Sequence, residues 1–143
     1  MPIRIGKAKW KGILIEGTGN VSTESNQLNS HYGFSSRFES GKGTNPEELL
    51  GAAHAACFSM ALAHELASKG YVADEVETED KVHIDKTPDG FRITKIEITT
   101  EANVARIDES LFNEIAEQVK NTCPVSRALS ATPMTLTARL RKR

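Results

Sequence analysis

Apolar and polar positions alternate near the start of the chain and predict β-structure there. In the segment AKWKGILIEG, Ala8 and Trp10 alternate with lysines and lead into the apolar run 13–15. A period of two is typical of a strand with one buried face. Gly17 and Gly19 follow, and they predict a turn.

A second segment with strand character is HYGFSSRFES, residues 31–40. Phe34 and Phe38 supply its apolar positions. Arg37 is expected on the face opposite Phe38, because successive side chains alternate across a strand. The glycines of the following SGKGTN segment predict a flexible loop.

Residues 45–69 are predicted to form one long helix, because the segment begins with N-terminal capping residues and is followed by a C-terminal glycine. Asn45 can cap the first turn, Pro46 suits the first helical position, and Glu48 can complete a capping box. Gly70 fits the end of the helix. Because alanine covers much of its surface, we expect this helix to be central, covered by sheet or by a second subunit. Its expected apolar face consists of Leu49, Leu50, Ala53, Cys57, Met60 and Ala61.

A β-hairpin follows the helix. Residues 76–85 alternate between inward and charged positions, TPDG at 87–90 predicts the turn, and 91–104 predicts the returning strand. The isoleucine spacing of the returning strand slips by one near Lys95, which indicates a β-bulge. The inward positions of the first strand are expected to be Val76, Thr78, Val82 and Ile84.

A second helix is predicted after Asp108. Cys123 precedes Pro124, which disfavours helix at Cys123, while Pro124 itself can open a short helix in PVSRAL. The segment MTLTARL predicts a closing strand. This order predicts an α+β fold with mostly antiparallel sheet, in a single domain spanning residues 1–143. The inward face of the second helix is expected to be Leu111, Phe112, Ile115, Ala116 and Val119.

Composition and charge narrow the classes of function. Of the 143 residues, 38% are hydrophobic and 26% are charged, which is ordinary for a globular protein. A net charge of −1 gives no general attraction to nucleic acid or to an anionic membrane. The first residues do not resemble a signal peptide, and the apolar run 51–63 is expected to be too short to cross a bilayer. We therefore expect a soluble, cytoplasmic protein with no nucleic-acid or membrane partner.

The candidate chemistry rests on two cysteines, Cys57 in the alanine-rich helix and Cys123, 66 positions later. Two cysteines are too few for a disulfide scaffold, and a C-x-x-C motif is absent. The reactive form of cysteine is the thiolate, and Cys57 lies too far along the helix for the dipole to favour it. His54, one turn earlier, is more often a core residue. Glu47, on the same side of the helix, could hold a long cation, and Arg37 is the nearest candidate along the chain.

Three other classes are open on the residues alone. A metal site could use His54, Cys57 and Cys123 with His83 or His64, although only His54 and Cys57 are close in sequence. A non-catalytic small-molecule binder or structural stress protein would leave both thiols unreactive towards peroxide. A cysteine hydrolase would pair Cys57 with His54, for which the sequence offers no evident orienting acid.

Two segments resemble a known family. SSRFESGKGTNPEELLGAAHAACFSMALA, residues 35–63, and CPVS at 123–126 together resemble the osmotically inducible protein C and organic hydroperoxide resistance (OsmC/Ohr) family. The joint pattern is specific: N-P-E, a cysteine ten residues after that glutamate, and a distant C-P. The arginine in SRFE, just before N-P-E, is similar to the OsmC branch.

The resemblance implies an intertwined homodimer, with antiparallel sheets wrapped around paired central helices and active sites at the subunit interface. It also implies a peroxiredoxin-like thiol peroxidase (EC 1.11.1 type) that reduces alkyl or fatty-acid hydroperoxides in oxidative and osmotic stress defence. Cys57 matches the peroxidatic cysteine and Cys123 the resolving cysteine, while Arg37 matches the activating arginine and Glu47 the glutamate that orients it. No cofactor or metal is implied, and the reductant would be a dithiol such as a lipoylated protein. Candidates for an apolar substrate wall are Phe34, Leu50, Phe58 and Met60.

Overall fold

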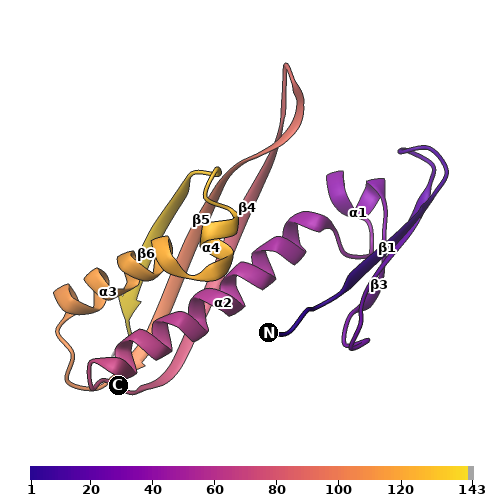
Figure 1. Cartoon of the computed structure of the whole chain (residues 1–143). Helices are drawn as coiled ribbons and strands as arrows, with labels where there is room; N and C mark the ends of the chain where they lie inside the picture. Colours follow the sequence, from indigo (N-terminus) through magenta and orange to yellow (C-terminus); the bar gives the residue numbers. More distant parts are fainter. Residues whose placement is uncertain (142–143) are drawn as a thin grey trace. The chain divides into compact units, whose positions relative to one another are not determined.

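The computed structural model describes residues 1–141, and the chain divides between residues 49 and 50 into two compact units. The first unit contains three strands and a short helix, and the second contains a three-stranded sheet with helices. The two units are coloured along the chain from indigo to yellow (Figure 1). The structure has the expected α+β composition.

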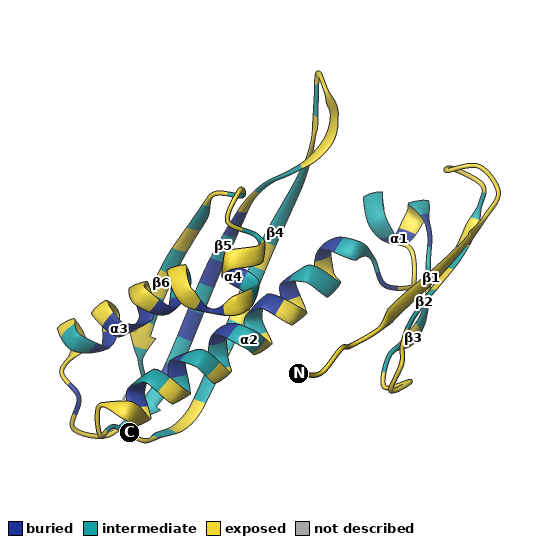
Figure 2. Ribbon diagram, in the orientation of Figure 1, coloured by how far each residue is buried: buried dark blue, intermediate teal, exposed yellow. Residues whose placement is uncertain are grey.

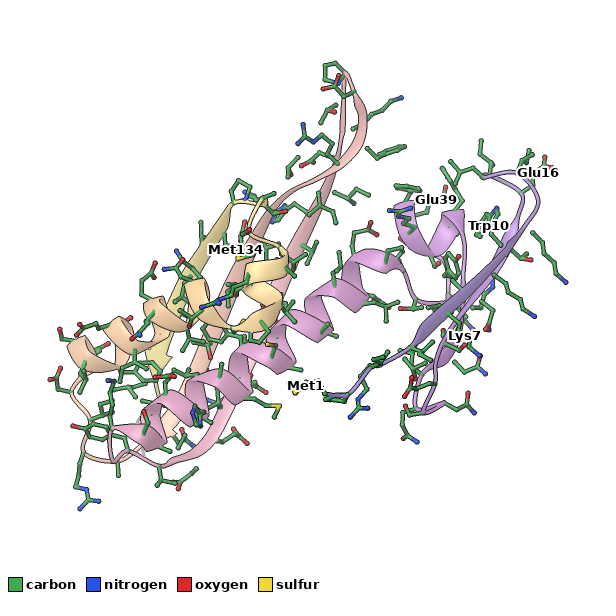
Figure 3. All side chains as sticks on the ribbon, in the orientation of Figure 1. Met1, Lys7, Trp10, Glu16, Glu39 and Met134 are labelled. Atoms are coloured by element: carbon green, nitrogen blue, oxygen red, sulfur yellow. The ribbon has the colours of Figure 1, made fainter. Side chains whose placement is uncertain are left out.

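The sheet of the first unit is an antiparallel meander of β1 (Gly6–Lys11), β2 (Thr18–Thr23) and β3 (Asn29–Tyr32). Gly19 lies inside β2 and not in a turn, so that prediction was wrong. It pairs with Trp10 and Tyr32, and a Cβ at this position would come within 2.5 Å of the Tyr32 ring. Glycine is needed there because two aromatic rings approach the backbone. Figure 3 shows Trp10 on this sheet.

The apolar run 13–15 does not extend the first strand, contrary to the prediction. Gly12 has a φ of +96°, which ends β1, and the Gly17 amide then donates to the Ile13 carbonyl at 2.7 Å. The run is therefore a turn whose three side chains are all exposed. Glycine accepts this left-handed backbone without the steric cost that other residues meet.

Residues 34–38 form a helical turn, α1 (Phe34–Phe38), and not the predicted strand. The amide of Arg37 donates to the Gly33 carbonyl at 3.1 Å, a helical i to i−4 bond. The buried Ser36 hydroxyl stabilises this turn, because it accepts from the Gly33 amide at 2.9 Å and contacts the Thr44 carbonyl at 2.8 Å. Phe34 and Phe38, spaced by four, fit one helix face as well as one strand face, and the serine contacts favour the helix.

The long helix is confirmed as α2 (Pro46–Ser68). The Asn45 side chain accepts from the Glu48 amide at 2.8 Å, as a cap should. At the other end, Gly70 adopts a φ of +89°, and the amides of Gly70 and Tyr71 satisfy the last carbonyls of α2. Both ends of the helix therefore follow from the local sequence.

The second unit is built on the sheet β4–β5–β6. The hairpin of β4 (Ala73–Thr87) and β5 (Gly90–Val104) turns where expected, and its register shifts between His83 and Ile84, opposite the predicted bulge. The closing strand, β6 (Met134–Leu140), pairs with β5 in parallel. The helices α3 (Glu109–Thr122) and α4 (Pro124–Ala128) are also as predicted, with the Asp108 side chain capping α3. Helices α2, α3 and α4 lie on one face of this sheet (Figure 1).

The core of the second unit lies between this sheet and its helices. Within the chain, α2 does not bury the expected face, because Ala53 and Met60 are exposed. Figure 2 shows buried and exposed positions recurring along this helix. The buried residues of α2 beyond its first turn are Gly51, His54, Phe58, Leu62 and Leu66, which recur every three or four positions as one helix face does.

By length and composition α2 could cross a membrane, since it has 23 residues and a window of mean hydropathy 1.2. The apolar run 51–63 was expected to be too short to cross a bilayer, and this expectation does not hold for the whole of α2. A core helix of a soluble protein passes the same test, and 28% of the window of α2 is buried inside the protein. Its fully buried histidine, His54, also pairs with a carboxylate of β4.

Candidate functional site: two thiols and a buried polar chain

In the first unit, Arg37 forms a bidentate ion pair with Glu47. Its Nε lies 3.1 and 3.2 Å from the two carboxylate oxygens, and its Nη2 lies 2.7 Å from Oε1. Glu47 is buried and the Arg37 side chain is partly exposed. A bidentate, partly desolvated pair fixes the guanidinium plane much more firmly than a surface contact does. The predicted partners Arg37 and Glu47 are thus brought together.

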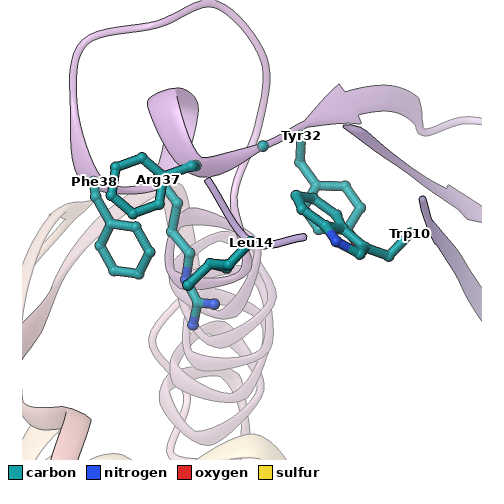
Figure 4. Close-up of a pocket in the computed structure, with 7 residues that line it drawn as sticks. Trp10, Leu14, Tyr32, Arg37 and Phe38 are labelled. Carbon is teal, nitrogen blue, oxygen red and sulfur yellow. The ribbon is translucent and has the colours of Figure 1, made fainter. Parts of the chain in front are cut away.

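Beside Arg37 the first unit has an aromatic pocket of about 250 Å³. The Arg37 guanidinium lies 5.2 Å from the centre of the Phe38 ring, and the rings of Trp10 and Tyr32 are 5.5 Å apart. Figure 4 shows Arg37 between Phe38 and the pair of Trp10 and Tyr32. The pocket therefore offers apolar walls around one cation.

In the second unit, Cys57 packs against the buried core cluster that includes Cys123, and the Cys123 thiol influences the ionisation of Cys57. Cys57 is half-buried, whereas Cys123 is buried at the junction of α3 and α4. Burial raises the pKa of the Cys57 thiol, the backbone of Val125 lowers it by hydrogen bonding, and Cys123 raises it. Within the second unit, therefore, the net effect is against the thiolate of Cys57.

A buried polar chain leads away from Cys123. Its thiol donates to the Ser126 hydroxyl at 3.0 Å, and Ser126 Oγ lies 2.7 Å from His54 Nε2. The other ring nitrogen of His54, Nδ1, pairs with Asp80 Oδ2. Four side chains from α2, β4 and the α3–α4 junction are thereby connected.

Two members of this chain, Asp80 and Ser126, were missed in the sequence. Asp80 occupies an inward position of β4, in the same alternation as Val76, Thr78 and Val82. An acidic residue at an inward strand position indicates a buried carboxylate that needs a partner, and this could have identified Asp80. It is also the orienting acid for His54 that the sequence did not make evident. Ser126 carried no distinguishing pattern beyond its place in CPVS.

Other predicted site residues fall elsewhere. Phe58 is fully buried in the core, so it cannot line a substrate wall, while Phe34 does line the aromatic pocket. Met60 is 77% exposed on α2. Among residues 1–141, no group of three or more His, Cys, Asp or Glu side chains is arranged to hold a metal ion.

Comparison with known proteins identifies the family. The family model for OsmC-like proteins matches residues 39–138. Peroxiredoxin OsmC of Escherichia coli K12 is 51% identical over 127 residues, which cover 88% of this chain and 89% of that protein. Organic hydroperoxide resistance protein OhrB of Bacillus subtilis is 34% identical over 87 residues, 60% of this chain and 62% of its own. The chain belongs to the OsmC-like protein family.

Solved structures agree on the fold. An organic hydroperoxide resistance protein OsmC from Legionella pneumophila superimposes with a TM-score of 0.70 at 22% identity, over 99% of this chain and 100% of that one. An OsmC-like protein from Mycoplasma pneumoniae gives a TM-score of 0.75 at 18% identity, over 99% of both chains. At these identities the likeness is one of fold.

The proximity of the two thiols makes the ionisation of Cys57 depend on Cys123. Replacing Cys123→Ser removes a neighbouring thiol that raises the pKa of Cys57. We expect Cys57 in this variant to be alkylated at lower pH than in the wild type, as measured by the pH dependence of the iodoacetamide reaction rate. Ser130→Ala, an exposed serine substitution nearby, should leave the curve unchanged. An unchanged curve for Cys123→Ser would contradict the contact between the thiols.

Proposed function

We propose that this chain is a thiol-dependent peroxidase that reduces organic hydroperoxides to alcohols. The observation that carries the proposal is that the half-buried Cys57 packs against the buried core cluster that contains Cys123, 66 positions away in sequence. A relative that is 51% identical bears the name peroxiredoxin, which supports the same chemistry.

In the first step the Cys57 thiolate attacks the distal oxygen of the hydroperoxide. The O–O bond breaks, the alkoxide takes up a proton to become the alcohol, and Cys57 becomes a sulfenic acid. Cys57 is the better candidate for this step because it is more exposed than Cys123. Sulfur is oxidised by two electrons, so no cofactor is needed.

In the second step the Cys123 thiolate attacks the sulfur of the Cys57 sulfenic acid. The S–O bond breaks, water leaves after protonation, and a Cys57–Cys123 disulfide forms. This step protects Cys57 from irreversible over-oxidation. An external dithiol then restores both thiols by exchange, and the family resemblance favours a lipoylated protein for that role.

The ion pair of Arg37 with Glu47 is proposed to activate Cys57. Burial raises the pKa of the Cys57 thiol, so a nearby cation is needed to favour the thiolate at neutral pH. Glu47 accepts from Nε and Nη2 of Arg37, which leaves N–H donors on Nη1 and Nη2 for the peroxide. The same cation would stabilise negative charge on the departing oxygen.

The aromatic pocket beside Arg37 supports an organic substrate. Its volume of about 250 Å³ suits an alkyl or aryl group more than the two oxygens of hydrogen peroxide. Apolar walls also favour the organic group through desolvation. Alkyl and fatty-acid hydroperoxides are thus the proposed substrates, in oxidative and osmotic stress defence.

The pocket also supports a second candidate, a non-catalytic binder of small apolar molecules. The two functions differ in the reactivity of Cys57 towards peroxide. Rapid consumption of cumene hydroperoxide with a dithiol, measured by stopped flow against hydrogen peroxide, supports the peroxidase. Saturable binding of the hydroperoxide without its consumption would support the binder.

We propose that the active form is a homodimer in the cytoplasm, where thiols remain reduced. The face of α2 opposite its buried residues is apolar and exposed within one chain, which is unfavourable for a lone subunit. This face consists of Ala52, Ala53, Ala56, Met60 and Ala67.

The two cysteines should fail at different steps. Cys57→Ser should abolish turnover, because serine is nearly isosteric but supplies no thiolate. Cys123→Ser should consume about one equivalent of peroxide and then stall as the sulfenic acid. Peroxide consumed per subunit and trapping by dimedone measure both outcomes. Continued turnover by Cys57→Ser would refute the proposed peroxidase mechanism.

Removing the activating charge should damage catalysis without removing a thiol. Arg37→Ala should shift Cys57 alkylation to higher pH and reduce the rate of peroxide reduction by about 100-fold or more, as loss of a charge-stabilising donor typically does. Glu47→Ala should give a smaller loss, because Glu47 positions Arg37 without touching sulfur. Arg92→Ala, an exposed arginine of β5, serves as the control. Superimposable alkylation curves for wild type and Arg37→Ala would exclude activation by Arg37.

The exposed face of α2 should be essential for assembly. Met60→Glu should weaken the dimer, because it places a charge in the proposed apolar interface. Gln118→Glu introduces the same carboxylate at an exposed position of α3 and should leave the dimer intact. Sedimentation velocity at micromolar concentration measures both. A stable, folded wild-type monomer under these conditions would contradict the homodimer.

A further inference from the structure

The proposed peroxidase reaction leaves three buried polar residues without a role: Asp80, His54 and Ser126. They connect in that order to the Cys123 thiol through the hydrogen bonds described above. His54 and the Asp80 side chain are fully buried, Ser126 is 3% exposed and Cys123 is 2% exposed. Burying four polar groups is costly unless each is paired, and each of the four has a partner in this chain. Within residues 1–141, the second carboxylate oxygen of Asp80, Oδ1, is buried without a hydrogen-bond partner.

The donors in this chain define a direction for proton movement. Cys123 donates its S–H to Ser126, so the Ser126 hydroxyl proton is available to His54 Nε2. His54 then carries its own proton on Nδ1, facing Asp80. Moving one proton along each hydrogen bond, from Cys123 to Ser126 and from Ser126 to His54, yields a thiolate and an imidazolium. Both states use the same positions of the heavy atoms.

The same three residues have the composition of a serine hydrolase triad, and burial argues against that function. In a hydrolase the serine oxygen must reach a substrate carbonyl, with the histidine and acid behind it. Here Ser126 Oγ is enclosed and lies between Cys123 and His54. The group that the triad acts on is therefore the Cys123 thiol.

We propose that Asp80, His54 and Ser126 form a proton relay that controls the resolving step at Cys123. This inference rests on the proposed function, because it assigns Cys123 to that step. The Cys123 proton passes through Ser126 to His54, and Asp80 stabilises the resulting imidazolium. The Cys123 thiolate then forms the S–S bond with Cys57, the S–O bond breaks, and the hydroxide leaves as water after taking a proton from solvent.

The relay returns its proton when the disulfide is reduced. Cys57 is the more exposed sulfur, so the thiolate of the external dithiol attacks it and Cys123 leaves. His54 returns the proton to the Cys123 thiolate through Ser126. The second thiol of the reductant then releases Cys57 from the mixed disulfide. Asp80, His54 and Ser126 do not touch the peroxide or Cys57; in this proposal they act on the reaction through the Cys123 proton.

Other groups facing Cys123 do not replace the relay. On α2, Cys57 interacts with Cys123, and His54 is linked to it through Ser126; Asp80 of β4 is linked only through His54. The Ser126 amide donates to Cys123 Sγ at 3.4 Å, but an amide cannot accept the thiol proton. On α3, Lys120 lies one turn before Cys123 and is ion-paired with Glu117 at 2.6 Å. The imidazole is the one base that the hydrogen bonds connect to this thiol.

The first experiment separates the two chemical steps. In Ser126→Ala and His54→Gln, formation of the Cys57 sulfenic acid should stay within about twofold of wild type, while disulfide formation at neutral pH should slow by about 100-fold, the lower range of general base catalysis. Raising the pH should restore much of the lost rate, because the thiol then ionises without help. Ser130→Ala, an exposed serine four residues after Ser126, is the control and should match the wild type. Disulfide formation at the wild-type rate and pH dependence in both relay variants would overturn the proposal.

The second experiment needs no peroxide and so separates failure of the relay from failure of the peroxidase. The Cys57→Ser variant has Cys123 as its only thiol, so its ultraviolet thiolate absorbance, after subtraction of a Cys57→Ser, Cys123→Ser protein that corrects for the two tyrosines, reports Cys123. Adding Ser126→Ala should delay the appearance of this absorbance to higher pH. Asp80→Asn in the same background tests the acid and should give a shift in the same direction. Identical absorbance curves would overturn the relay even if the wild type is a peroxidase, as would labelling of Ser126 by a fluorophosphonate.

Discussion

The pairing of His54 with Asp80 is the constraint on which the second unit depends. Both side chains are fully buried, and buried ionisable groups are tolerated only when they are paired. Since His54 lies on α2 and Asp80 on β4, one register of the helix on the sheet satisfies both. That register also places Cys57, one turn further along α2, beside Cys123. This polar contact lies on the same helix face as Phe58, Leu62 and Leu66, which pack in the core beside the two thiols.

Much of this arrangement could be predicted from local sequence, because it rests on local rules. Asn45 and Gly70 define the ends of α2 through cap geometries that depend only on the residues next to them in sequence. The isoleucine spacing predicted the irregularity of the hairpin, since a slip of one residue moves a side chain to the other face. The family motif joined Arg37 to Glu47, and the two are indeed ion-paired.

The wrong or incomplete predictions share one physical cause. Where a local sequence fits two structures equally well, contacts with distant parts of the chain decide which one forms. Phe34 and Phe38 fit a helix and a strand alike, and contacts of the buried Ser36 select the helix. On this alanine-rich helix the buried face carries Phe58, Leu62 and Leu66, and it can also include His54 because Asp80 is opposite it. Asp80 was overlooked because its partner is 26 residues away in sequence.

Cys57 is half-buried and Cys123 is buried, so the thiolates of the two residues must be stabilised in different ways. For the half-buried Cys57 we propose a permanent cation, Arg37, which Glu47 holds in a bidentate ion pair. A permanent cation beside the buried Cys123 would need its own buried counter-charge at every stage of the cycle. In the proposed relay the buried anion, the Asp80 carboxylate, is already present, so the imidazolium formed when the Cys123 proton moves arises beside its counter-charge. On this argument the proposed relay of Asp80, His54 and Ser126 has the same task at Cys123 that we propose for Arg37 and Glu47 at Cys57.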